Sequence, residues 1–317
     1  MLLFKHPLIS APRRRRPRRR AGRSRAGGTV TVDPSILARP SGGYAMLAVD
    51  QREALRAMFA AYQPEPVADA QLTAFKVDAA RALSPYASAI LIDKQFGWDA
   101  VIADNAVDPS CALIAAADAF SPSATEFVAD VVIDPEVDPA TVRKEGAKAL
   151  KLLVLYRPDE SPEPRIAMVT DFVARCREAG LISIIEPVSR GPRDGGAYDH
   201  EAGIRAAARE LGALGADLYK SEVPTHGKGT PDEITAGCAS LSSAISSPWV
   251  VLSSGVPAEV FPEAVRLACR AGASGFLAGR AVWASVVGSP TMADDLRTIS
   301  VDRLRRLADV VDDAMSR

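Results

Sequence analysis

With 317 residues, 48% of them hydrophobic, the chain is long enough for one large α/β domain or two small ones. It contains no run of about 18 apolar residues, so the sequence predicts no membrane-spanning helix. The three histidines (His6, His200 and His226) lack metal-ligand spacing, and the four cysteines form no CxxC pair. We therefore expect no metal site, and a cytoplasmic protein with reduced thiols.

Charge is distributed unevenly along the chain. The net charge is −1, but residues 1–28 hold Lys5 and nine arginines without an acid and contribute +10, which leaves −11 for the rest. Such a basic segment is typical of an arm that binds nucleic acid or a membrane surface, or of a targeting peptide. It lacks the patterns of a targeting peptide, and nothing in the acidic remainder suggests a polyanionic partner. We expect residues 1–28 to be a disordered extension without a nucleic-acid partner, and residues 29–317 to be the folded domain.

Apolar segments typical of strands alternate with helical segments from residue 44 onward. We expect strands at 44–50, 87–93, 112–117, 149–156, 181–187, 215–224, 249–255 and 275–279. We expect helices to begin near residue 51 and to span about 68–83, 138–149, 165–179, 199–213, 232–244, 257–271 and 294–315. Residues 157–164 are predicted to form a loop, and residues 118–135 a long loop or an inserted β-excursion at 128–133.

This alternation predicts the fold class. Strands that alternate with helices imply right-handed βαβ crossovers and a parallel sheet. Eight such units suit a closed barrel better than an open sheet. An open doubly wound sheet should carry a glycine-rich fingerprint after its first strand, but this chain has Asp50-Gln51-Arg52-Glu53 there. The predicted fold is therefore α/β, with a single (β/α)8 TIM barrel.

Three successive predicted strands carry the ionisable residues Lys151, Glu186 and Lys220. The simplest interpretation of Lys220 is a lysine that pairs with Glu222 or projects from a strand end. Alternation along the strand would place Leu218, Lys220 and Glu222 on one face. The three strands together, however, provide what an amine nucleophile needs: a neighbouring cation that lowers its pKa and an acid that moves protons. We therefore expect a nucleophile at Lys220, with Glu186 and Lys151 as its partners.

Polar residues also follow the first and the last two strands, at the rim where barrel enzymes hold their active sites. They are Asp50, Gln51, Arg52, Ser253, Ser254, Gly255, Gly279 and Arg280. In barrel enzymes, the loops after strands seven and eight commonly bind phosphate. Taken singly, Gly279 could instead serve only for close packing, and any one of the charged residues could form only a salt bridge. The whole set predicts a phosphorylated ketone that forms an imine with Lys220, so that the protonated imine replaces a metal ion as the electron sink.

Several stretches carry a family resemblance. They are 42–53 (GGYAMLAVDQRE), 82–91 (ALSPYASAIL), 148–155 (KALKLLVL), 184–188 (IIEPV), the strand with Lys220, and 271–283 (AGASGFLAGRAVW). With these stretches in this order, residues 30–317 resemble class I aldolases of the tagatose-1,6-bisphosphate aldolase type, and among them the sulfofructosephosphate aldolases.

The resemblance has implications for both the site and the reaction. It implies that Lys220 forms the imine and that Glu186 and Lys151 handle protons and charge. It implies that the loops with Ser253, Ser254, Gly279 and Arg280 bind the phosphate. It also implies that Asp50, Gln51 and Arg52 line the rim of the active site. It implies a metal-independent, cofactor-free lyase, a homo-oligomer, that cleaves 6-deoxy-6-sulfofructose 1-phosphate to dihydroxyacetone phosphate and 3-sulfolactaldehyde.

Two alternatives stay open on the sequence alone. One is a class I aldolase that acts on tagatose 1,6-bisphosphate or fructose 1,6-bisphosphate, because these enzymes share the motifs. The other is a non-catalytic regulator that binds a phosphosugar and contacts nucleic acid through the basic segment. The distal anion of the substrate has five candidate cations: Arg52, Lys94, Arg190, Arg193 and Lys228.

Overall fold

The computed structural model describes residues 32–316. The extension expected at residues 1–28 lies outside the described residues. No helix between residues 32 and 316 is both long enough and apolar enough to cross a lipid bilayer.

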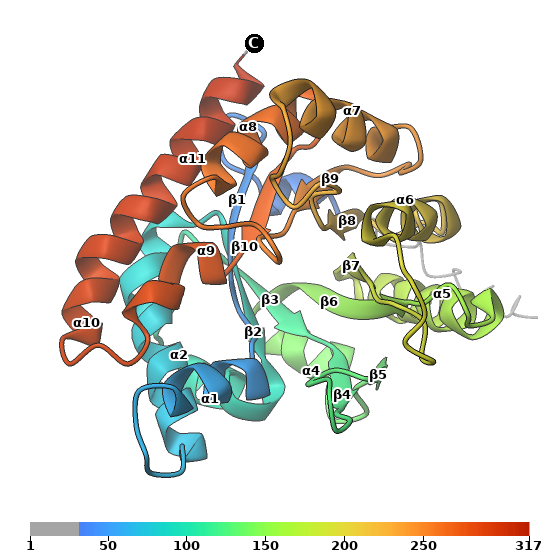
Figure 1. Ribbon diagram of the computed structural model, residues 1–317. Coiled ribbons are helices and arrows are strands. Elements are labelled where there is room, and N and C mark those ends of the chain that lie inside the picture. The colour runs from blue at the N-terminus through green and yellow to red at the C-terminus, as the bar shows by residue number, and fades with distance from the viewer. Residues whose placement is uncertain (1–31, 317) are drawn as a thin grey trace, which may run out of the picture.

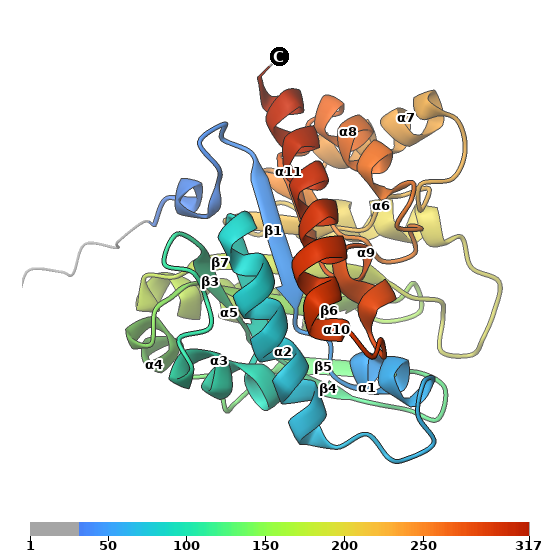
Figure 2. The same ribbon diagram turned by 90° about the vertical axis from the view of Figure 1, so that its left-hand side faces the viewer.

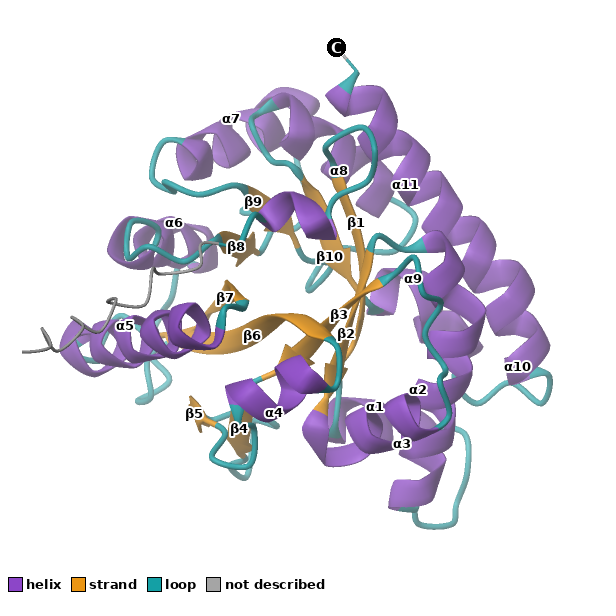
Figure 3. Cartoon of the chain, turned by 180° about the vertical axis from the view of Figure 1, so that it is seen from behind, coloured by secondary structure: helices purple, strands orange, loops and turns teal. Residues whose placement is uncertain are grey.

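Parallel strands form a closed barrel in the order β1-β10-β9-β8-β7-β6-β3-β2, so that the last strand of the barrel pairs with the first (Figure 1). The strands are β1 (Tyr44–Val49), β2 (Ala89–Asp93), β3 (Ala112–Ala116), β6 (Ala147–Tyr156), β7 (Ile182–Ser189), β8 (Leu218–Ser221), β9 (Trp249–Val251) and β10 (Gly275–Ala278). Helices surround these strands on the outside, as Figure 3 shows. The predicted (β/α)8 TIM barrel is confirmed.

Helices connect successive strands and close the chain. They are α1 (Glu53–Ala60), α2 (Asp69–Leu83), α3 (Asp99–Ala103), α4 (Pro139–Lys144), α5 (Pro162–Ala179), α6 (His200–Leu211), α7 (Pro231–Ser242), α8 (Phe261–Arg270), α9 (Arg280–Trp283), α10 (Met292–Asp295) and α11 (Val301–Met315). Local signals set several of their ends. Thr230 and Glu233 form a capping box at the start of α7, and Gly180, with a φ of 66°, ends α5.

Some helix boundaries differ from those expected. The helix expected at 138–149 ends at Lys144, because Gly146 adopts a φ of 115° and the chain joins β6 from Ala147 onward. Helix α5 begins at Pro162 rather than at residue 165, since proline fits the first turn of a helix. The short helix α9 was not predicted, and the closing helix contains a π-helical turn at Leu296–Ser300.

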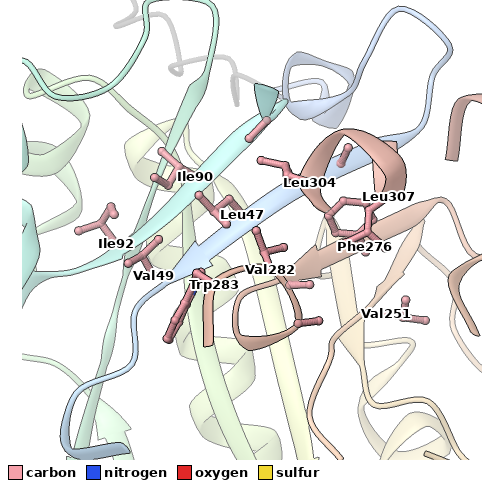
Figure 4. Packing of buried hydrophobic residues seen from close by; sticks show 14 of the residues in the cluster. Leu47, Val49, Ile90, Ile92, Val251, Phe276, Val282, Trp283, Leu304 and Leu307 are labelled. Atoms are coloured by element: carbon pink, nitrogen blue, oxygen red, sulfur yellow. The ribbon is translucent and has the colours of Figure 1, made fainter. Parts of the chain in front are cut away.

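Strand alternation divides the buried core into two layers. Side chains such as Met46 and Ile184 fill the interior of the barrel. Their sequence neighbours point outward, where Leu47 packs in the same layer as Leu304 and Leu307 of α11 (Figure 4). Residues that continue the inward phase past the layer of core side chains therefore reach the C-terminal rim of the barrel.

An antiparallel hairpin interrupts the barrel pattern between β3 and β6. It consists of β4 (Asp118–Ser121) and β5 (Asp130–Ile133). Figure 2 shows this hairpin at the same end of the molecule as α1, which follows the C-terminal end of β1. Of the two possibilities that the sequence allowed for residues 118–135, the β-excursion is therefore the correct one.

The four cysteines lie in the core and should be inert. Burial raises the pKa of the Cys111, Cys238 and Cys269 thiols to about 12 and also raises that of Cys176. Because the thiolate is the reactive form, we expect the native protein to react with Ellman's reagent far more slowly than a free thiol at pH 8, and all four cysteines to react after denaturation. Rapid modification of any cysteine in the native protein would contradict this arrangement.

Candidate active site

A cavity of about 640 Å³ opens at the C-terminal ends of the barrel strands. Most of the predicted site residues line it: Asp50, Gln51, Arg52, Glu186, Lys220, Ser253, Ser254, Gly279 and Arg280. Lys151 does not line the cavity and is fully buried. Gly255 is not part of the lining either; its φ of 76° lets the loop after β9 turn, and the His226 ring packs 3.0 Å from where a Cβ would be.

Two lysines approach the same carboxylate. The Nζ of Lys220 lies 2.9 Å from Glu186 Oε1, and the Nζ of Lys151 lies 3.2 Å from Glu186 Oε2. The strands that carry these residues are neighbours in the barrel, and each residue continues the inward phase of its strand. The sequence placed the three side chains on successive strands, and the structure brings them into contact.

The simpler interpretation of Lys220, a pair with Glu222, is wrong. Glu222 lies past the end of β8 and does not share the environment of Lys220. Its Oε2 accepts a hydrogen bond from the Ser189 N–H at 2.8 Å, and its Oε1 lies 3.2 Å from His200 Nε2. The expected alternation holds for Leu218 and Lys220, which are part of the strand, and fails for Glu222 because the strand ends before it.

Lys151 is surrounded by carboxylates. Its Nζ lies 2.7 Å from Asp50 Oδ2 and 2.7 Å from Asp118 Oδ2, in addition to Glu186. Burial would lower the pKa of Lys151, but the nearby acids outweigh burial and raise that pKa well above its usual value. Burial would likewise raise the pKa of Asp50, but Lys151 and Lys220 hold it below its usual value. Lys151 is thus suited to supply a fixed positive charge, and Glu186 is the better placed group for moving protons.

Further ion pairs join these residues into one buried group. Arg52 donates to Asp118 at 2.9 Å, and its Nε lies 3.9 Å from Asp93 Oδ2. Lys76 lies 2.5 Å from Asp93 and donates to the Val49 carbonyl. We refer to the connected set as the charge cluster; its members are Asp50, Arg52, Lys76, Asp93, Asp118, Lys151, Glu186 and Lys220. The cluster contains as many acids as cations, and each member is at most 8% exposed.

The loops after β9 and β10 form one end of the cavity. Arg280 donates to the Ser254 hydroxyl at 3.1 Å, so the two predicted phosphate loops are in contact. Gly279 is required here, because a Cβ at this position would lie 2.4 Å from the Ala48 carbonyl oxygen. An exposed guanidinium beside small hydroxyl side chains is an arrangement that suits an oxyanion.

The opposite end of the cavity is formed by the β4–β5 hairpin and by the loop after β7. Phe120, Thr125, Glu126 and Phe127 of the hairpin line it together with Arg190. These hairpin residues were not predicted as part of the site, because the sequence of this segment did not show which way it folds.

Of the five candidate cations for a distal anion, Arg52 and Arg190 line the cavity, and Lys94, Arg193 and Lys228 do not. Arg52 is committed to the charge cluster, and its guanidinium also lies 4.2 Å from the centre of the Phe120 ring. The side chain of Arg190 is 34% exposed, and its Nε lies 4.0 Å from Glu126 Oε1. Arg190 is therefore the candidate with a guanidinium available to a ligand.

Comparison with known proteins gives the family. The sequence profile of the DeoC/LacD family aldolases matches residues 44–285. The tagatose 1,6-diphosphate aldolase 2 of Enterococcus faecalis is 30% identical over 307 residues, which cover 87% of this chain and 91% of that protein. The chain belongs to the DeoC/LacD family of aldolases.

Other comparisons agree with this assignment. The tagatose 1,6-diphosphate aldolase of Listeria monocytogenes is 28% identical, with 87% of this chain and 90% of that protein covered. A solved structure of fructose-bisphosphate aldolase from Plasmodium falciparum has the same fold, with a TM-score of 0.64, 14% identity and coverage of 87% and 92% of the two chains. This chain is therefore a lyase, a class I aldolase, rather than a non-catalytic regulator.

Sequence reasoning missed one residue that organises the centre of this aldolase. Asp118 accepts hydrogen bonds from Lys151 Nζ at 2.7 Å, from the Leu153 N–H at 2.9 Å and from Arg52 at 2.9 Å. It is fully buried at the start of β4. A signal was present, because Asp118 directly follows the predicted third strand, as Asp50 ends the first. The carboxylate was not predicted, because the sequence left residues 118–135 open between a long loop and a β-excursion at 128–133 and did not indicate a strand that begins at Asp118.

Proposed function

We propose that this aldolase cleaves 6-deoxy-6-sulfofructose 1-phosphate to dihydroxyacetone phosphate and 3-sulfolactaldehyde through an imine at Lys220. The order of groups across the cavity is the observation that carries the proposal. Ser254 and Arg280 follow β9 and β10, Lys220 and Glu186 line the cavity from β8 and β7, and Arg190 follows β7 beside the β4–β5 hairpin, which comes after β3 on the side of the barrel across from β9 and β10. This order suits a ketose with a phosphate on C1, a carbonyl at C2 and an anionic group on C6.

The reaction follows from an amine next to an acid. The Nζ of Lys220 adds to the C2 carbonyl, and loss of water from the carbinolamine leaves a protonated imine. Removal of the C4 hydroxyl proton breaks the C3–C4 bond, and the bonding electron pair moves into the imine to give an enamine as the aldehyde leaves. The enamine takes a proton at C3, and hydrolysis then releases dihydroxyacetone phosphate and restores Lys220.

We assign the proton transfers to Glu186 and the electrostatic support to Lys151. Glu186 Oε1 lies 2.9 Å from the attacking nitrogen, within reach of the proton that must leave before attack. Lys151 touches the other oxygen of the same carboxylate and is itself held in the charged form by its acids. Its ammonium therefore supplies a fixed positive charge beside the carboxylate that passes the protons.

The charge at the far end of the cavity supports a sulfonate rather than a second phosphate. A sulfonate carries one negative charge, whereas a phosphate monoester carries nearly two at neutral pH. Arg190 offers one positive charge, and Glu126, 4.0 Å from its Nε, offsets part of it. The sequence resemblance to sulfofructosephosphate aldolases supports the same choice.

Tagatose 1,6-bisphosphate or fructose 1,6-bisphosphate is the second candidate substrate, because the Enterococcus and Listeria relatives are tagatose 1,6-diphosphate aldolases. Side-by-side measurement of kcat/KM on the sulfonated sugar phosphate and on both bisphosphates separates the candidates. We expect the sulfonated substrate to be preferred at least tenfold. A preference for either bisphosphate would overturn the sulfonate assignment and leave the imine mechanism intact.

Replacing Arg190 by glutamine tests the distal end. Loss of a charge-assisted contact of about 1.5–3 kcal/mol should raise the KM for the sulfonated substrate roughly 10- to 100-fold and change kcat much less. Dihydroxyacetone phosphate lacks the distal group, so its borohydride trapping at Lys220 should be unaffected.

Arg193→Gln is the matched control in the same loop. Arg193 pairs with Glu160 and Asp130 outside the cavity, and its side chain is 46% exposed. We expect this variant to keep the KM of the parent enzyme. An Arg190→Gln enzyme with an unchanged KM would show that another group binds the distal anion.

A further inference from the structure

Three potential metal ligands meet outside the cavity. His200 begins α6, Glu222 follows β8, and His226 lies in the loop after β8. The Nε2 atoms of His200 and His226 lie 3.2 Å and 3.9 Å from the same oxygen, Glu222 Oε1. All three ligand atoms lie within 4.8 Å of one another, and none of the three residues lines the cavity. The sequence spacing gave no sign of this cluster, because the loops after β7 and β8 bring residues together that are distant in the chain.

The surrounding structure holds two of these side chains in position. Glu222 is 2% exposed, and its Oε2 accepts the Ser189 N–H at 2.8 Å, which leaves Oε1 directed at the histidines. His226 has a φ of 53°, an uncommon conformation for a residue other than glycine, and its N–H donates to the Val223 carbonyl at 2.8 Å. Its ring packs against Gly255, the residue whose missing side chain makes room for it.

One polar atom in this cluster lacks a partner. The Nε2 of His226 is buried and makes no hydrogen bond. Most buried polar atoms in proteins form a hydrogen bond, so a buried nitrogen without one, directed at a fixed carboxylate oxygen, indicates that a further group binds between them. A cation between His226 and Glu222 would be such a group.

The chemistry of the three donors identifies the class of ion. Two imidazole nitrogens and one carboxylate form a set that binds Zn²⁺ and leaves a fourth position to water. Ligand atoms on a tetrahedral zinc ion lie roughly 3.3 Å apart, whereas the present atoms are separated by 3.2 Å, 3.9 Å and at most 4.8 Å, so binding requires movements of about 1.5 Å or less. The side chain of His200 is 32% exposed and can make this movement, and its solvent side is open to a water ligand.

We propose that His200, Glu222 and His226 form a binding site for a divalent transition-metal ion, with Zn²⁺ as the preferred physiological ion. The ion links the start of α6 to the loop that follows the Lys220 strand, and His226 supports Gly255 in the loop of Ser253 and Ser254. A bound ion would therefore stabilise the rim of the barrel. Because the ligands lie outside the cavity, the cleavage reaction continues without the ion.

The test uses the full chain, freed of metal by a chelator and then dialysed. Titration with Zn²⁺ in a calorimeter is expected to show one tight site per chain, and Zn²⁺ should raise the melting temperature. Titration with Co²⁺ should produce the intense visible absorption of a tetrahedral Co²⁺ centre. Turnover should be the same before and after chelation.

Three variants decide whether these residues are the ligands. His226→Asn removes the imidazole but tolerates the left-handed backbone, and should weaken Zn²⁺ binding at least 100-fold without unfolding the protein. His200→Ala should also weaken binding and remove the Co²⁺ absorption. His6→Ala is the control for the remaining histidine and should bind as the parent protein does. Absence of a one-to-one site in the parent, or binding that survives His226→Asn unchanged, would overturn the proposal.

Discussion

Replacing Lys220 by alanine is expected to reduce cleavage by roughly 10⁴-fold or more and to abolish covalent trapping of dihydroxyacetone phosphate by borohydride. Lys220 is the lysine in residues 32–316 whose side chain lines the cavity. Lys151 cannot take over the attack, because it is fully buried and three carboxylates hold it charged. Mass spectrometry of the trapped protein should place the adduct on the peptide that contains Lys220.

The fold should survive this substitution. Glu186 keeps Lys151 as a partner at 3.2 Å, so it does not become an isolated buried charge. Circular dichroism should therefore remain close to that of the parent, and thermal unfolding should show a folded protein of lower stability, because the charge cluster loses one of its cations. Lys94→Ala is a matched control, because Lys94 pairs with Asp99 at the rim and does not line the cavity. A Lys220→Ala enzyme that still turns over, or an adduct on a different lysine, would refute the imine assignment.

Replacing Lys151 by methionine should damage both stability and activity. The substitution keeps the approximate length of the side chain and removes the charge that Asp50, Asp118 and Glu186 share. Removing one partner from buried ion pairs typically costs about 3–5 kcal/mol, which we expect as the loss in the free energy of unfolding in urea. Loss of the fixed positive charge beside Glu186 should lower kcat by roughly 10²- to 10³-fold.

A double variant separates the two effects. Lys151→Met combined with Asp118→Asn removes one of the uncompensated negative charges and should recover part of the lost stability. It should not recover activity, because the ammonium next to Glu186 is still missing. If Lys151→Met were as stable as the parent, the carboxylates would not depend on Lys151 as their geometry indicates. Asp130→Asn is a control at an exposed acid of the same hairpin.

The sequence predicted the barrel because each of its strands is a short apolar run with helical segments between, and this pattern is local. It also predicted the contact between Lys151, Glu186 and Lys220, since strand alternation and barrel order determine which inward side chains become neighbours. The separation of Glu222 from Lys220 was not predicted, because it depends on where β8 ends, a boundary that hydrogen bonds to neighbouring strands decide.

Other parts of the site depend on long-range arrangement. Asp118 begins a hairpin whose strands carry weak apolar alternation, so the sequence did not show that its carboxylate points back to Lys151. Arg190 could not be chosen among five cations until the partners of the others were known. His200 and His226 come close only because the loops after β7 and β8 meet. The hydrophobic periodicity of the sequence does not predict contacts between loops.

The charge cluster has a consequence for the whole reaction course. Its acids and cations are equal in number, so the formal charges of the buried group sum to zero. Passing a proton from Lys220 to Glu186 moves charge within the group but leaves its sum unchanged, and a protonated imine carries the same charge as the ammonium it replaces. The proposed chemistry can therefore proceed from free amine to covalent adduct and back without leaving a net charge stranded in a medium of low polarity.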